Sequence, residues 1–335
     1  NEQLILPRKK DQKITMIGGF IDQMRIQGGG SSYATPTQID QVIDIAGSYS
    51  DHITIEKGYH LSAKTDPLLA EQALQAAKEN DVVVYFMGLR EQDESEGFDR
   101  KDLSIPKNQI TLLNDIKKVN KHIIVVILGG SVSQLTFTEE CKGLLIAYLG
   151  GQAAASAILD LLFGKVSPSG RLAETWIDDI KNHPVQLTKD NHSVHYEESI
   201  FVGYRYFTTF KKQVRYPFGY GLSYVPFDYK SCRIKEESDH FLIHVDIENK
   251  GIMDAKEVIQ IYVKNHQSSV YRPLRELKTF KKELISKGEV KTIELRLGKD
   301  AFAYYDIYQK KWMTEKGVYH IEICKNASEV IYSKE

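Results

Sequence analysis

The stretch DVVVYFMGLREQDESEGFDR, residues 81–100, joins an almost unbroken apolar run to a loop that holds five acidic residues. The apolar part, 81–88, is typical of a strand that is covered on both faces of a sheet. Most charged loops are only solvated and carry no chemistry. The five acidic residues are Glu91, Asp93, Glu94, Glu96 and Asp99. Their role must therefore be inferred from the rest of the sequence.

More short apolar runs surround this strand in the first half of the chain and alternate with helical patterns. Strands are predicted at 13–20, 51–58, 81–88, 122–130 and 143–151. Helices are predicted at 65–80, 105–120 and 151–164. In the first helix, Asp66 suits the N-cap and Pro67 occupies the first helical position. This alternation predicts an α/β domain with a mostly parallel sheet.

The pattern changes near Lys235, where apolar and polar residues begin to alternate. Strands are predicted at 240–251, 255–265, 290–298, 301–312 and 318–326, with turn residues between them. Such a pattern predicts an antiparallel β-sandwich of about seven short strands. We therefore expect three segments: an α/β domain at 1–165, an ordered, aromatic-rich connector packed on both domains at 166–235, and the β-sandwich at 236–335.

The composition excludes several classes of protein. The 335 residues are 42% hydrophobic and 27% charged, with a formal net charge of −1. The absence of a basic stripe argues against nucleic-acid or anionic-membrane binding, and no apolar run reaches the length of a membrane span. Cys141, Cys232 and Cys324 lie far apart in the sequence without a CxxC pattern, which argues against a disulfide framework and a zinc site. We expect a reducing, cytoplasmic compartment of bacterial type and no metal or other cofactor.

The acidic loop leaves the carboxyl end of strand 81–88, the edge at which open α/β sheets bind ligands. The loops 25–32, 129–131 and 149–152 follow other predicted strands and should end at the same edge. Their glycines and serines suit either ligand binding or tight turns and backbone caps. The sequence contains neither a GK[ST] P-loop nor a GxSxG motif, which argues against nucleotide binding and against a Ser–His–Asp hydrolase. We predict the functional site at this rim.

Eight motifs in this order resemble the C-terminal half of glycoside hydrolase family 3, the β-glucosidase-like enzymes. They are ILP at 5–7, RIQGGGSS at 25–32, ESEGFDRKDLSIPKNQ at 94–109, the run from YLGGQ to AETW at 148–176, YEESIFVGYRYF at 196–207, YPFGYGLSYVPFDY at 216–229, IENKGIMDAKEVIQIYV at 247–263 and RPLRELKTFKKELISKGE at 272–289. The resemblance implies an (α/β)6-sandwich domain followed by a fibronectin-type-III-like domain. The (β/α)8 barrel that carries the Asp nucleophile in the family is absent.

The resemblance also implies retaining hydrolysis of β-glucosides or related sugars, which requires two carboxyl groups roughly 5 Å apart. Glu96, directly before Gly97, matches the acid/base position of the family best, and Glu94 is the second candidate because the register of the loop is not fixed. Asp99 and Arg100 are expected to support the loop by pairing with each other or with backbone. Glu91 and Asp93 are expected to be solvated.

By the same resemblance, Arg25, Gln27, Ser31 and Ser32 edge the site near the leaving-group sugar, where they either bind the sugar or only shape the loop. The expected partners are a β-glucoside or oligosaccharide substrate and a (β/α)8 barrel in the same parent protein or on another chain. The alternative function is a non-catalytic carbohydrate-binding or scaffolding module. We expect the β-sandwich to be structural, since the sequence reveals no exposed aromatic platform, and the chain alone to be inactive.

Overall fold

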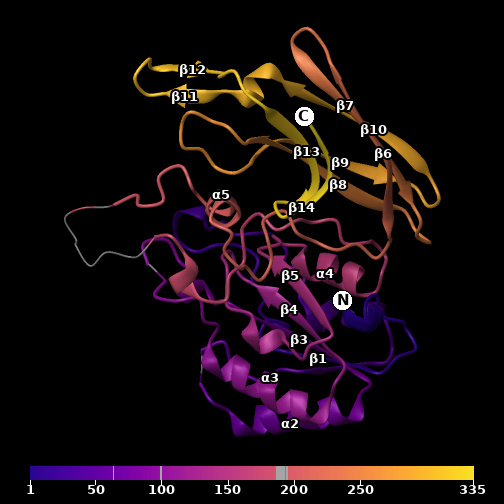
Figure 1. Ribbon diagram of the computed structural model, residues 1–335. Helices are drawn as coiled ribbons and strands as arrows, with labels where there is room; N and C mark the ends of the chain where they lie inside the picture. Colours follow the sequence, from indigo (N-terminus) through magenta and orange to yellow (C-terminus); the bar gives the residue numbers. More distant parts are fainter. Residues whose placement is uncertain (63, 99, 186–192, 194) are drawn as a thin grey trace. The chain divides into compact units, whose positions relative to one another are not determined.

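The computed structural model of the chain describes residues 1–62, 64–98, 100–185, 193 and 195–335. The chain divides into two compact units, Asn1–Val166 and Ser167–Glu335 (Figure 1). A separate connector at 166–235 stays a prediction.

The first unit is built on a parallel sheet with the strand order β2-β1-β3-β4-β5. The strands are β1 (Ile14–Ile17), β2 (Ile53–Glu56), β3 (Val82–Gly88), β4 (Ile123–Leu128) and β5 (Gly143–Tyr148). Every residue of β1, β3 and β4 is buried, as their continuous apolar runs predict. Gly88 ends β3 with a φ of +151°, and a Cβ there would lie 1.8 Å from the carbonyl oxygen of Leu128 on β4. The predicted α/β class is confirmed.

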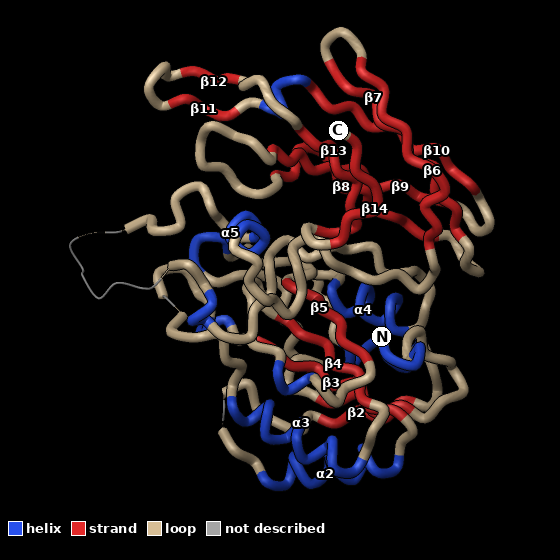
Figure 2. Tube along the Cα trace, viewed as in Figure 1, coloured by secondary structure: helices blue, strands red, loops and turns tan. Residues whose placement is uncertain are grey.

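Helices cover this sheet and connect its strands. They are α1 (Val42–Ile45), α2 (Pro67–Glu79), α3 (Lys107–Val119) and α4 (Ala154–Leu162). The Asp66 carboxylate caps α2 by accepting hydrogen bonds from the backbone N–H groups of Leu68 and Leu69, as its position before Pro67 predicts. Figure 2 shows α2 and α3 side by side. Short 3-10 turns lie at Glu2–Leu4, Gly30–Ser32, Ala46–Ser48, Glu91–Asp93 and Thr136–Thr138.

The second unit is an antiparallel β-sandwich, as predicted, preceded by α5 (Tyr204–Thr209) and the 3-10 turn Ile180–Asn182. One sheet has the order β10-β7-β6 and the other β14-β13-β8-β9. The strands are β6 (Phe227–Glu236), β7 (His240–Asn249), β8 (Ala255–Asn265), β9 (Glu276–Ile285), β10 (Val290–Gly298), β13 (Tyr319–Asn326) and β14 (Glu329–Lys334). Alternate residues such as Ile243, Val245 and Ile247 on β7 pack in the core against Ile259 and Ile261 on β8.

The segment 301–312 does not form the single strand that its alternation predicts. It follows the 3-10 turn Lys299–Phe302 and folds as a hairpin of β11 (Tyr304–Asp306) and β12 (Lys311–Met313). The Asp306 carboxylate accepts hydrogen bonds from the N–H groups of Tyr308 and Gln309 at 2.8 Å each, and Lys310 adopts a φ of +52°. These features turn the chain in the middle of the apolar run.

Within the described part of the chain, no helix has both the length and the apolar character that crossing a membrane requires.

Candidate active site

Loops from the carboxyl ends of four strands meet at one edge of the parallel sheet. The loop after β1 pairs with the loop after β3 through a parallel bridge between Gly29 and Ser95. The loop after β5 joins them because the N–H of Gly151 donates to the carbonyl of Ile26 at 2.9 Å. The loop after β4 is bound to the loop after β3 because Gly130 and Ser131 donate hydrogen bonds to Glu94. The four loops therefore lie together at the rim where the sequence places the site.

Glu94 ties three of these loops together. Its carboxylate accepts hydrogen bonds from the Gly130 N–H at 2.7 Å, from the Ser131 hydroxyl at 2.9 Å and from the Arg25 guanidinium at 3.3 Å. The Glu94 side chain is only 8% exposed. Both carboxylate oxygens are engaged by groups of the chain itself, so this acid has a structural task at the centre of the rim.

Glu96 lies two residues further on and has a different environment. It is exposed, and its Oε2 atom accepts a hydrogen bond from the Ser31 N–H at 2.6 Å. Hydrogen bonds from the Ser31 hydroxyl and from the Ser31 N–H lower the pKa of the Glu96 carboxyl below its usual range. Among the described residues, Ser31 is the residue that hydrogen-bonds this carboxylate. Glu96 therefore presents an exposed, ionised carboxylate that is held by one neighbouring residue.

Gly30 allows this approach. It has a φ of +83°, and a Cβ at this position would lie 2.4 Å from the Cβ of Glu96. Only glycine combines this conformation with such a close side chain without strain. Gly30 is thus explained by the packing of Glu96, and Gly29 by the packing of Ser95, whose Oγ atom would lie 2.6 Å from a Cβ at that position.

The residues expected to edge the sugar site fall into two groups. Arg25 is 7% exposed and bonded to Glu94, and its Nε atom is buried without a hydrogen-bond partner among the described residues. Gln27 clamps the loop by donating to the Ala34 carbonyl at 2.8 Å and accepting from the Ala34 N–H at 3.0 Å. Ser31 and Ser32 are exposed at the rim. Arg25 and Gln27 therefore shape the loop, and the two serines remain accessible.

The structure describes one of the two residues expected to support the acidic loop. Asp99 lies outside the described residues. Arg100 donates hydrogen bonds to the Ser131 hydroxyl at 2.9 Å and to the Val132 carbonyl at 2.6 Å, so it holds the loop after β4 together with Glu94, which also bonds to Ser131.

The expectation that Asp93 is solvated is wrong. Its carboxylate pairs with the Arg90 guanidinium at 2.6 Å and 2.8 Å, and the side chain is 20% exposed. Burial raises the pKa of Asp93, but the hydrogen bonds from Arg90 outweigh it and lower the pKa overall. Glu91 is 57% exposed. Sequence reasoning missed Arg90 and Ser131 as partners, because nothing in the sequence says which cation or hydroxyl faces which acid.

Within the described ranges, no group of three or more His, Cys, Asp or Glu side chains is arranged to hold a metal ion.

Comparison with known proteins gives two family matches and many relatives. Residues 1–224 match the glycosyl hydrolase family 3 C-terminal domain, and residues 257–327 match the fibronectin type III-like domain. The chain is 41% identical to thermostable beta-glucosidase B of Acetivibrio thermocellus over 99% of its own length and 45% of that protein's length. It is 39% identical to an exo-alpha-(1->6)-L-arabinopyranosidase of Bifidobacterium longum, again over less than half of that protein, 42%.

A solved structure shows the same fold. The crystal structure of a GH3 beta-glucosidase from Bifidobacterium adolescentis matches with a TM-score of 0.94 and 37% identity, over 100% of this chain and 50% of the other. The chain thus spans about half the length of the relatives that it matches. It belongs to glycoside hydrolase family 3 and corresponds to the C-terminal portion of the β-glucosidases of that family.

Proposed function

We propose that this chain supplies the general acid/base to a retaining β-glucosidase, and that Glu96 is that residue. The observation that carries the proposal is the contrast between the two candidate acids at the rim. The Glu94 side chain is 8% exposed and bonded to three donors, whereas Glu96 is exposed and held in place by Ser31. A group that gives a proton to a leaving oxygen must have an oxygen that reaches the substrate.

The second carboxylate comes from elsewhere in this proposal. Retaining hydrolysis needs a nucleophile roughly 5 Å from the acid/base. We place it on a (β/α)8 barrel in the same parent protein or on another chain, in keeping with relatives that are about twice as long. The barrel then binds the sugar ring, and the rim of this chain faces the leaving group with Ser31 and Ser32 beside it.

The electrostatics of Glu96 make this proposal specific. A general acid must hold its proton near neutral pH, yet Ser31 lowers the pKa of Glu96 in this chain. A nucleophile carboxylate brought to about 5 Å and the burial of the site would both raise that pKa. Glu96 is therefore an ionised carboxylate in the isolated chain and becomes an acid only when the barrel is in place.

We propose a β-glucoside or a related oligosaccharide as the substrate. The names of the relatives cover both a β-glucosidase and an exo-α-(1→6)-L-arabinopyranosidase. Both proteins match this chain over nearly its whole length, so we assign the choice of sugar ring to the barrel.

All three cysteines of the chain are free thiols, which supports the proposed reducing compartment.

The proposal is tested by comparing Glu96→Ala with Glu94→Ala in the chain assembled with its barrel. Glu96→Ala should slow glucosides with poor leaving groups far more than activated aryl glucosides, which need little protonation. Azide should restore part of the turnover by replacing water in the second step. The exposed Glu91 provides the matched control, and Glu91→Ala should behave as the unmodified chain. If Glu94→Ala shows this pattern and Glu96→Ala does not, the assignment is wrong. If no barrel restores activity, the non-catalytic carbohydrate-binding module becomes the better account.

A further inference from the structure

The hairpin β11–β12 of the second unit exposes aromatic rings on one face. Tyr305 and Trp312 are directly opposite each other in its register, with ring centroids 5.7 Å apart and an interplanar angle of 73°. Tyr305 is 49% exposed, Trp312 71%, and Tyr308 in the turn 91%. Tryptophan is rarely so exposed in a folded chain. The expectation that the β-sandwich offers no aromatic platform is therefore wrong.

The two strands of the hairpin present no charged side chain on this aromatic face. Successive side chains of a strand point to opposite faces, so Tyr304 and Asp306 on β11 lie on the face opposite to Tyr305. Lys311 pairs with Asp306 in the register and shares that other face, away from Trp312. Because the ring planes lie 73° apart, the exposed pair offers two apolar ring surfaces set at an angle, and their polar groups, a phenol O–H and an indole N–H, lie at the ring edges.

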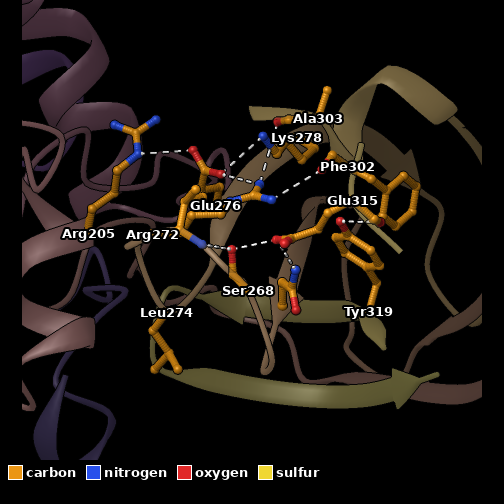
Figure 3. Close-up of polar contacts among 12 residues, drawn as sticks. Arg205, Ser268, Arg272, Leu274, Glu276, Lys278, Phe302, Ala303, Glu315 and Tyr319 are labelled. Atoms are coloured by element: carbon orange, nitrogen blue, oxygen red, sulfur yellow. Dashed lines mark hydrogen bonds and ion pairs between the residues drawn. The ribbon is translucent and has the colours of Figure 1, made fainter. Parts of the chain in front are cut away.

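The first strand of the hairpin is fixed at its base. The Arg272 guanidinium donates to the Phe302 carbonyl at 3.2 Å and lies 5.7 Å from the centroid of the Tyr304 ring. Arg272 in turn pairs with Glu276 at 3.3 Å, and Figure 3 shows Glu276 between Arg272, Arg205 and Lys278. The residues before and in β11 are therefore held by a buried arginine, whose side chain is 9% exposed.

The second strand is fixed by Glu315, which follows β12. Its carboxylate accepts from the Ser268 hydroxyl at 2.5 Å, from the Ser269 N–H at 2.8 Å and from the Asn265 amide at 3.0 Å (Figure 3). Both ends of the hairpin are thus tied to the same loop, 265–272, between β8 and β9. A short hairpin of three-residue strands would fray by itself, but these ties preorganise it.

We propose that the face formed by Tyr305 and Trp312 is a second carbohydrate-binding site, for neutral β-linked oligosaccharides. A pyranose ring with equatorial hydroxyls has two apolar C–H faces and a polar rim, which matches aromatic faces with polar edges. The lack of a charged strand residue on this face disfavours phosphate, metal or charged peptide ligands. Oligosaccharides are also the expected ligand class because the relatives of this chain are named as glycosidases.

Size favours this ligand over a protein partner. An aromatic side chain buries about 150–250 Å², so the two rings offer roughly 300–500 Å². A stable protein interface buries about 800 Å² on each partner. Tyr308 in the turn adds a third ring, so the aromatic rings of the hairpin offer at most about 450–750 Å², which is still below that area. The site therefore fits one or two sugar rings, whereas a protein or a second copy of the chain would need further surface.

The two tryptophans of the chain allow a direct test by NMR on the 335-residue protein. Trp312 is exposed, whereas Trp176 is 1% exposed and reports on the interior. Titration with cellotetraose or laminaritetraose should shift the indole N–H signal of Trp312 saturably, with a millimolar Kd, and leave that of Trp176 in place. Trp312→Ala and Tyr305→Ala should each weaken binding about tenfold or more, measured by calorimetry. Phe280, 64% exposed on β9, provides the matched control Phe280→Ala, which should bind as the unmodified chain.

Three outcomes would overturn the proposal. The Trp312 signal stays in place at tens of millimolar oligosaccharide, or the affinity survives in Trp312→Ala while its unfolding temperature equals that of the unmodified chain. In the third outcome, gel filtration shows that the chain self-associates and that Trp312→Ala removes this association. The face formed by Tyr305 and Trp312 would then be an interface between copies of the chain. Because hydrolysis is not measured, the result is independent of the role proposed for Glu96.

Discussion

Replacing Glu94 by alanine should destabilise the first unit strongly, even though the residue lies in a loop. Three donors lose their acceptor, and of the carboxylates in the described part of the chain the Arg25 guanidinium, 7% exposed, keeps Glu91 at 3.9 Å. Removing one partner of a buried ion pair costs about 3–5 kcal/mol. The nearby Glu91 and the solvent at the rim reduce this, so we expect about 2–4 kcal/mol.

Thermal unfolding of the isolated chain measures this loss. For a unit the size of Asn1–Val166, each kcal/mol shifts the midpoint by about 2–4 °C, which predicts a fall of roughly 4–16 °C. Glu94→Gln keeps the shape and one acceptor oxygen and should cost about 1–2 kcal/mol. Glu91→Ala is the matched control, since Glu91 is 57% exposed, and should stay within about 0.5 kcal/mol of the unmodified chain. Equal effects of Glu94→Ala and Glu91→Ala would refute the structural role of Glu94.

Two further predictions concern carboxylates with lowered pKa values. Ser31→Ala removes the hydroxyl that lowers the pKa of Glu96 but keeps the N–H, so this pKa should rise part of the way towards its usual value of about 4.3, as followed by carboxyl ¹³C NMR. Ser32→Ala is the control and should leave the pKa of Glu96 unchanged. An equal rise in both variants would contradict the role given to the Ser31 hydroxyl. In the β-sandwich, hydrogen bonds from Ser231, then Thr292 and Arg233, lower the pKa of Asp246 to about 2. Because the folded pKa lies below the unfolded value of about 3.9, this stabilisation is present above pH ~4 and is lost as the pH falls towards 2. Asp246→Asn should therefore reduce the pH dependence of the free energy of unfolding between these pH values, measured by urea unfolding. An unchanged pH dependence would show that these hydrogen bonds do not stabilise the folded state.

The sequence predicts the fold well where one local pattern determines the structure. The continuous apolar runs of β3 and β4 indicate buried parallel strands, and Asp66 with Pro67 locates the start of α2 to the residue. It fails at 301–312, because two three-residue strands and a turn have the same alternation as one long strand. The strands β6, β9 and β14 were not among those predicted.

The site is predictable only as a place and a set of residue types. Parallel strands bring their carboxyl ends to one edge, so the rim follows from topology. The roles of Glu94 and Glu96 do not, because both are acids in one loop and differ only in what faces them across the sheet edge. The burial of Arg25 and the exposure of Trp312 are likewise properties of packing that no local pattern encodes.

The most direct test of the central claim is the rate of aryl β-glucoside hydrolysis by the purified 335-residue chain, alone and after mixing with a (β/α)8 barrel of the parent protein. A general acid contributes about 10²–10⁴-fold, a small part of the 10⁶–10¹⁷-fold acceleration typical of enzymes. We therefore predict a folded chain with no detectable activity alone. Activity should appear with the barrel, saturate with its concentration, and fall in Glu96→Ala for poor leaving groups. Robust hydrolysis by the chain alone would contradict the account, because a nucleophile would then have to lie within these 335 residues.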